Sequence, residues 1–183
     1  MRLKGRACDG PGVTVVLGDK HTFAVEVGAW DHSLCRVDLW AAGKWLTCDD
    51  NMAFVGQFRR AVLDTADRLR SDGGLALPFD GSSPEATHRR LTLRAGTDDE
   101  TEADYELRSR FRALAWGPTT DNVTAYLFGD GDRSVLTLQF WRKEHLTEHP
   151  EDAGEVFVAE IPTAELVGIL DDLVAVLADP SRP

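Results

Sequence analysis

Apolar and polar residues alternate along residues 34–48, and this pattern predicts two antiparallel strands. A two-residue turn at positions 42 and 43 pairs Trp40 with Trp45 and Val37 with Cys48. This register gathers the apolar side chains on one face of the hairpin: Cys35, Val37, Leu39, Leu46 and Cys48. A shift by one residue would mix apolar and polar positions on both faces. We therefore predict this register, with the apolar face buried.

A period of three to four residues replaces the alternation after the hairpin and predicts an amphipathic helix over residues 50–70. Its apolar stripe consists of Met52, Val55, Phe58, Val62, Ala66 and Leu69. Asp49 or Asp50 is expected to cap its N-terminus. A second amphipathic helix is predicted over residues 163–178, where Pro162 stands at the first turn. These two helices are expected to cover one face of the sheet structure.

The remaining alternating segments predict further strands, with turns at Gly-rich and Asp-rich positions. The predicted strands are residues 13–17, 22–30, 88–95, 105–116, 123–128, 134–141 and 156–161. Asp130-Gly131-Asp132 is interpreted as a hairpin turn. The expected fold class is α+β, with predominantly antiparallel sheet of about seven to nine strands and the two helices.

The order of elements bears on domain organisation. Residues 71–87 are rich in Gly, Pro and Ser and form the best candidate linker. They separate residues 13–70 from residues 88–178, and each half is predicted as strands followed by a helix. We expect a single domain over 1–183. A ββββα duplication is an alternative reading, although no residue identity between the halves supports it.

The net charge of −11 narrows the class of partner. Such a charge repels nucleic acid and anionic membranes and favours a basic protein partner. The chain has no apolar run of about 18 residues, and its first residues lack the apolar core of a secretory signal. Its three cysteines suit a reducing compartment. These features predict a cytoplasmic protein that binds neither nucleic acid nor membrane.

Sequence motifs of known chemistry are weak or missing. His145-Leu146-Thr147-Glu148-His149 matches the H-x-x-E-H pattern of zinc peptidases, which requires a helix, but Pro150 follows immediately. We interpret this segment as a polar loop. No nucleophile elbow and no Gly-rich phosphate loop occurs. We therefore expect no catalytic residue, metal or cofactor. Whether the protein is an enzyme is left open, and we lean towards a protein without enzymatic activity.

Five arginines occupy alternating positions of two predicted strands: Arg90, Arg94, Arg108, Arg110 and Arg112. If these strands pair, five guanidinium groups share one face, and like charges side by side destabilise a sheet. Either Glu106 and the acidic residues of 98–104 neutralise them internally, or an external phosphate or carboxylate does so. The arginines are thus candidate ligand-binding residues. Trp40 and Trp45 are two further candidates for lining a pocket.

Three segments carry a resemblance of layout. They are Arg36-Val37-Asp38-Leu39-Trp40, Asp49-Asp50-Asn51, and Phe157-Val158-Ala159-Glu160-Ile161-Pro162 leading into an apolar helix. With the acidic composition, this layout resembles small uncharacterised acidic bacterial proteins, some of which are similar to immunity proteins of bacterial toxin systems. None of the segments is a specific motif, and the resemblance assigns no functional residue.

Three functional readings follow from the sequence. The first is a non-catalytic binding protein, such as an immunity-type neutraliser of a basic partner. The second is a domain that binds or transforms a small anionic ligand through the arginine face or through Trp40 and Trp45. The third is a structural homodimer. Charge and the lack of catalytic motifs favour the first reading.

Overall fold

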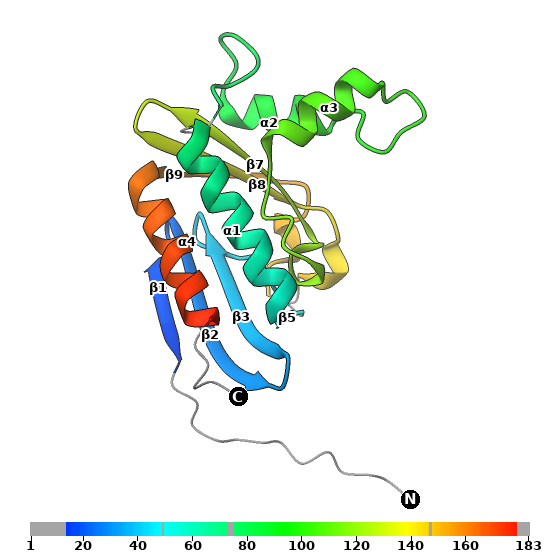
Figure 1. The fold of residues 1–183 in the computed structure, drawn as a ribbon. Helices are drawn as coiled ribbons and strands as arrows, with labels where there is room; N and C mark the ends of the chain where they lie inside the picture. The colour runs from blue at the N-terminus through cyan, green and yellow to red at the C-terminus, as the bar shows by residue number, and fades with distance from the viewer. Residues whose placement is uncertain (1–13, 49, 73–74, 147, 179–183) are drawn as a thin grey trace, which may run out of the picture.

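The computed structural model describes residues 14–48, 50–72, 75–146 and 148–178. Within these residues the fold is α+β, with antiparallel sheets of five and four strands and four α-helices (Figure 1). The first sheet contains β1 (Val15–Asp19), β2 (Phe23–Asp31), β3 (Leu34–Ala41), β4 (Lys44–Trp45) and β5 (Met52–Phe54). The second contains β6 (Arg112–Ala113), β7 (Val123–Asp130), β8 (Arg133–Phe140) and β9 (Val156–Pro162). The helices are α1 (Val55–Asp72), α2 (Pro84–Thr92), α3 (Glu102–Phe111) and α4 (Thr163–Leu177).

One hydrophobic core joins the two sheets. Helices α1 and α4 lie side by side and pack over both sheets (Figure 1). The core includes Val25 and Leu39 from the first sheet, Leu136 from the second, Phe58 from α1 and Leu173 from α4. These side chains are 2 % exposed or less, so their burial is the main source of stabilisation.

The predicted hairpin register is confirmed at its turn, where Trp40 pairs with Trp45 and Ala41 with Lys44. All five residues of the predicted apolar face are buried. The predicted pairing of Val37 with Cys48 is wrong, because the amide of Val37 instead donates to the carbonyl of Asn51. Cys48 has a positive φ of 38°, which turns the chain away from the ladder after β4.

The first predicted helix begins later than the sequence indicates. Residues 52–54 form β5, which pairs with β3, and α1 starts at Val55. A cap from Asp50 is therefore wrong, and Asp49 lies outside the described residues. The second half of the stripe behaves as predicted, since Phe58, Val62, Ala66 and Leu69 are buried in the core.

The predicted strand at 88–95 is wrong, because residues 88–92 belong to α2. The predicted strand at 105–116 is wrong over residues 105–111, which belong to α3, and only β6 at 112–113 is a strand. Helix α2 starts after Ser83, whose hydroxyl accepts a hydrogen bond from the amide of Ala86 at 3.2 Å. Helix α3 starts after Thr101, which forms a capping box with Asp104. Leu91 is buried whereas Leu93 is 75 % exposed, so the apparent alternation does not correspond to an inner face.

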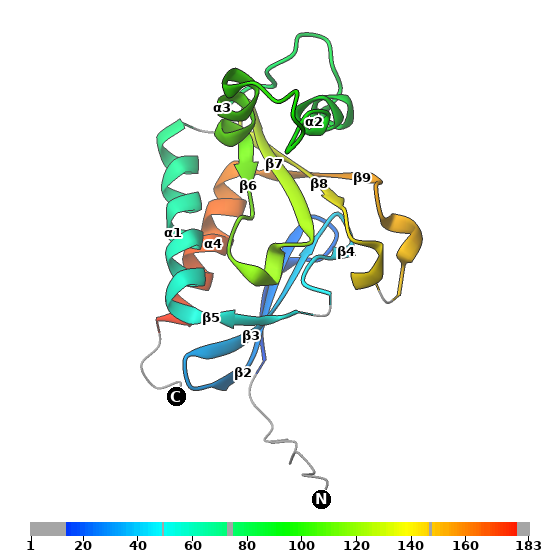
Figure 2. The same ribbon diagram turned by 90° about the vertical axis from the view of Figure 1, so that its right-hand side faces the viewer.

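Helices α2 and α3 cover the face of the second sheet that points away from α1 and α4. Tyr126, Phe128 and Val135 on this face form a second apolar cluster with Leu91 of α2 and Phe111 of α3. Figure 2 shows both helices at the end of the molecule opposite β5. The second sheet is thus covered on both faces, and this explains its long apolar strands.

Other predictions concern turns and connections. The Asp130-Gly131-Asp132 turn is confirmed, because Asp130 pairs with Arg133 across the β7–β8 hairpin. The H-x-x-E-H segment lies beside short 3-10 helices, η2 (Lys143–His145) and η3 (Pro150–Asp152), not on an α-helix, and Thr147 lies outside the described residues. None of the helices in the described part of the chain combines the length and apolar composition needed to span a bilayer.

Candidate functional site

Four of the five predicted arginines lie around the turn between α2 and α3. Arg90 lies in α2 and Arg94 follows its C-terminus, whereas Arg108 lies in α3 and Arg112 follows its C-terminus at the start of β6. Arg110 lies about 200° around the helix from Arg108, on the opposite side of α3. The helical period therefore sorts the arginines, and Arg110 lines neither pocket described below. A face of five arginines on a sheet does not form.

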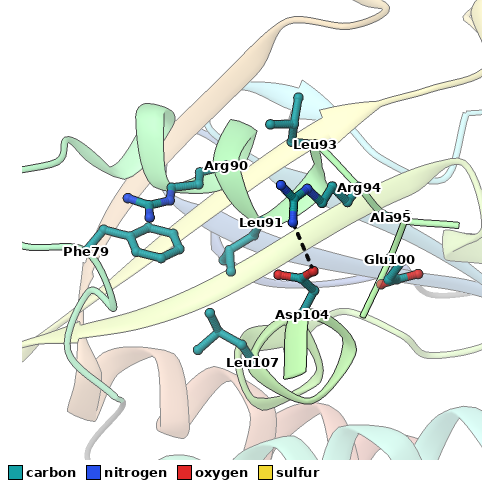
Figure 3. A pocket seen from close by; sticks show the side chains of 9 residues that line it. All are labelled: Phe79, Arg90, Leu91, Leu93, Arg94, Ala95, Glu100, Asp104 and Leu107. Atoms are coloured by element: carbon teal, nitrogen blue, oxygen red, sulfur yellow. Dashed lines mark ion pairs between the residues drawn. The ribbon is translucent and has the colours of Figure 1, made fainter. Parts of the chain in front are cut away.

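Arg90 and Arg94 line the first pocket, which has a volume of about 330 Å³ (Figure 3). The guanidinium of Arg90 lies over the ring of Phe79, 3.8 Å from its centroid. Arg94 pairs with Asp104 at 3.6 Å. Hydrogen bonds from the Thr101 hydroxyl and amide, aided by the charge of Arg94, hold the pKa of Asp104 below its usual range. Both arginines in this pocket are thus already engaged by neighbouring groups.

Arg108 and Arg112 line a second pocket of about 340 Å³ on the other side of residues 95–96. Arg108 forms a 2.7 Å ion pair with Glu100, and their side chains are only 16 % and 15 % exposed. Arg112 is exposed, and no ion pair joins it to another described residue. The internal neutralisation considered from the sequence is therefore present for Arg94 and Arg108, through Asp104 and Glu100, but not for Arg112.

Two buried polar side chains from helix α2 and strand β7 lie behind this second pocket. His88 Nδ1 is 2.9 Å from the hydroxyl of Thr137, and its ring contacts Tyr126 edge to face. Burial lowers the pKa of His88 to about 4 and raises that of Tyr126 to about 12. His88 Nε2 and the Tyr126 hydroxyl are buried without a hydrogen-bond partner among the described residues. Sequence reasoning missed this pair, because His88 was assigned to a strand and local periodicity does not record its contact with Tyr126.

Trp40 and Trp45 line a different and smaller pocket of about 130 Å³, beside Phe140, Leu146 and Asp152. Their rings stack with centroids 6.1 Å apart, and Lys20 lies 4.2 Å above the Trp40 ring. The structure therefore does not bring the tryptophans into the arginine pockets. Their stacking stabilises the β3–β4 hairpin directly.

A buried carboxylate that sequence reasoning placed on the polar face holds this hairpin in place. Asp38 is only 3 % exposed, and its oxygens accept hydrogen bonds from Trp45 Nε1 at 3.0 Å and Asn51 Nδ2 at 2.8 Å. Arg36 Nε donates to the second oxygen at 2.8 Å. A fully satisfied buried carboxylate of this kind fixes local geometry. These three hydrogen bonds engage both oxygens of the Asp38 carboxylate, so Asp38 has a structural role in the hairpin.

The chemistry available to these sites is recognition of polar and charged groups. Arginine guanidiniums and a protonated tyrosine are donors, suited to carboxylate or phosphate oxygens. Within the described residues, no three His, Cys, Asp or Glu side chains are grouped to hold a metal ion.

Comparison with known proteins identifies a fold relative. No protein-family model matches the chain, and no curated protein matches its sequence. Among solved structures, the fold is similar to that of CdiI from Burkholderia dolosa AUO158, with a TM-score of 0.56. The match covers 88 % of this chain and 99 % of that chain at 17 % sequence identity. The two proteins thus share a fold across nearly their whole lengths.

Proposed function

We propose that this protein is a non-catalytic binding protein of the immunity type, which neutralises a partner protein. The observation that carries the proposal is the fold shared with CdiI, an immunity protein. The layout of the sequence resembles the same class of protein independently of the fold.

We further propose that the partner is basic and that binding takes place in the cytoplasm. The net charge of −11 supports a basic partner. The α2–α3 turn contributes exposed acidic side chains at Asp98, Asp99 and Glu102. No ion pair engages these three carboxylates among the residues that the structure describes. Such groups accelerate association with a positively charged surface.

The test uses a toxic protein encoded beside this chain, expressed in a laboratory bacterium with and without it. We expect growth to be rescued only when the chain is present, and the purified proteins to form a complex. Failure of both rescue and binding would contradict the immunity-type proposal.

The charge of the partner is tested by association kinetics. We expect the on-rate to fall about tenfold or more between low and high salt, because salt screens long-range attraction. Asp99→Lys should slow association, whereas Asp172→Lys makes the same change of charge on α4 and should have less effect. An on-rate that does not depend on salt would rule out a basic partner while leaving neutralisation itself intact.

A further inference from the structure

The pocket beside Arg112 combines donors from the α2–α3 turn and the second sheet. Its volume of about 340 Å³ lies near the lower end of the range for small-molecule sites. Its lining includes Thr92, Arg108, Arg112, Tyr126, Gln139 and Trp141. The indole of Trp141 is 54 % exposed and gives the pocket an apolar wall. This pocket differs from the one in Figure 3, whose lining includes Arg90 and Arg94.

Arg112 provides the charge of this pocket. The positive charge of Arg108 is balanced by Glu100 at 2.7 Å, and no described carboxylate pairs with Arg112. Its backbone is fixed at the start of β6, where Arg112 pairs with Tyr126 across the sheet and its carbonyl accepts a hydrogen bond from Arg68 at 2.9 Å. Arg112 is therefore the lining charge that no described carboxylate balances, and Arg142, outside the lining, places a further guanidinium 4.0 Å from the centroid of the Trp141 ring.

Tyr126 provides a neutral donor in the same pocket. The residue is 1 % exposed, and its hydroxyl has no hydrogen-bond partner among the described residues. Burial raises the pKa of this hydroxyl to about 12, so it keeps its proton at neutral pH. Arg108 and Arg112 line the same pocket as Tyr126, and Arg112 lies directly opposite Tyr126 in the β6–β7 ladder. A buried donor of this kind is unfavourable while it lacks a partner.

We propose that this pocket binds the carboxylate of a small organic monoanion, which accepts hydrogen bonds from Arg112 and Tyr126. The guanidinium fork matches a carboxylate in geometry, and the negative charge of the ligand balances the positive charge of Arg112. A doubly charged phosphate would leave excess negative charge beside Glu100. Trp141 contacts the apolar body of the ligand. This site does not depend on the proposed partner binding.

The experiment titrates the full chain with sodium benzoate, acetate or phosphate at matched ionic strength and follows the melting temperature and the Kd by calorimetry. Benzoate at about ten times its Kd should raise the melting temperature by about 3–6 °C. Arg112→Gln should weaken benzoate binding about tenfold or more, and Tyr126→Phe about threefold to tenfold. Arg110→Gln removes the same charge on the far side of α3 and should leave the Kd within about twofold.

Folding does not confound these variants. The Tyr126 hydroxyl has no described partner and the Arg112 side chain is exposed, so both variants should melt near wild type without ligand. Lack of benzoate binding, or equal weakening by Arg110→Gln, would overturn the site. Phosphate binding tighter than benzoate would overturn the carboxylate assignment. A tripeptide with a free C-terminal carboxylate tests for a peptide ligand. The small-molecule assignment is overturned if this tripeptide binds more tightly than benzoate and the same tripeptide with an amidated C-terminus does not bind.

Discussion

At the scale of single residues, Asp38 and His88 differ in how the energetic cost of burying a polar side chain is compensated. Asp38 is buried with hydrogen bonds from Arg36, Trp45 and Asn51, so its charge is fully compensated. His88 is buried beside the Thr137 hydroxyl, and an interaction with the Gln139 side chain offsets only part of the cost of its burial. Removing a charge from water without compensation is unfavourable, so burial favours the neutral form of His88.

His88 makes stability depend on pH. Burial, followed by the charge of Arg89, lowers its pKa from 6.5 to about 4. Between these values the unfolded chain binds the proton and the folded chain does not, so stability falls as the pH drops from about 6.5 towards 4. We expect this residue to contribute a loss of about 3 kcal/mol across that window.

Urea unfolding between pH 7 and pH 4.5 measures this contribution. His88→Gln should have a shallower dependence of unfolding free energy on pH than wild type. His21→Gln, at an exposed histidine, should retain the wild-type slope. Equal slopes for wild type and His88→Gln would show that His88 is protonated in the folded state.

At the level of elements, the sequence predicted the turn of the β3–β4 hairpin correctly but did not predict the helices α2 and α3. The β3–β4 hairpin was predicted correctly at its turn, because only one register buries its apolar positions together. In α2 and α3, short segments of mixed character fit both periods, and the capping residues Ser83 and Thr101 mark the starts of helices. Capping signals were thus more informative there than alternation.

The buried face of β3 gives a stability prediction. Leu39 is fully buried in the main core, so Leu39→Ala should destabilise the protein by about 2–5 kcal/mol through lost burial and a cavity. Leu93→Ala deletes the same atoms from a side chain that is 75 % exposed, and should change stability by less than about 0.5 kcal/mol. Denaturant titrations compare the two, and a cost for Leu39→Ala below about 1 kcal/mol would contradict the packing of this face.

At the scale of the whole molecule, both sheets share one core. Residues of β2, β3, β8, α1 and α4 belong to the same buried cluster, so neither half buries its apolar face alone. The exposed ion pair between Arg70 of α1 and Asp171 of α4 joins the two helices at the surface. We propose that the described residues fold as a single domain.

This inference predicts cooperative unfolding. Tryptophan fluorescence and far-ultraviolet circular dichroism should give coincident transitions in urea, since loss of the shared core exposes both sheets together. Leu173→Ala in α4 should shift both transitions equally towards lower urea. Two separated transitions would instead indicate that the halves 13–70 and 88–178 are independent units.

The sequence by itself determined the α+β class, both long amphipathic helices, the hairpin turns and the buried face of β3. These follow from local periodicity, in which each residue's neighbours along the chain settle its environment. The capping residues Ser83 and Thr101 mark the starts of α2 and α3 in the sequence, but only the tertiary structure decided which sides of these helices are buried, because the second sheet defines their buried face. The tertiary structure also decided which arginines line the same pocket. Arg112 and Tyr126 come together through the pairing of β6 with β7, and no periodicity records a contact between residues on different elements.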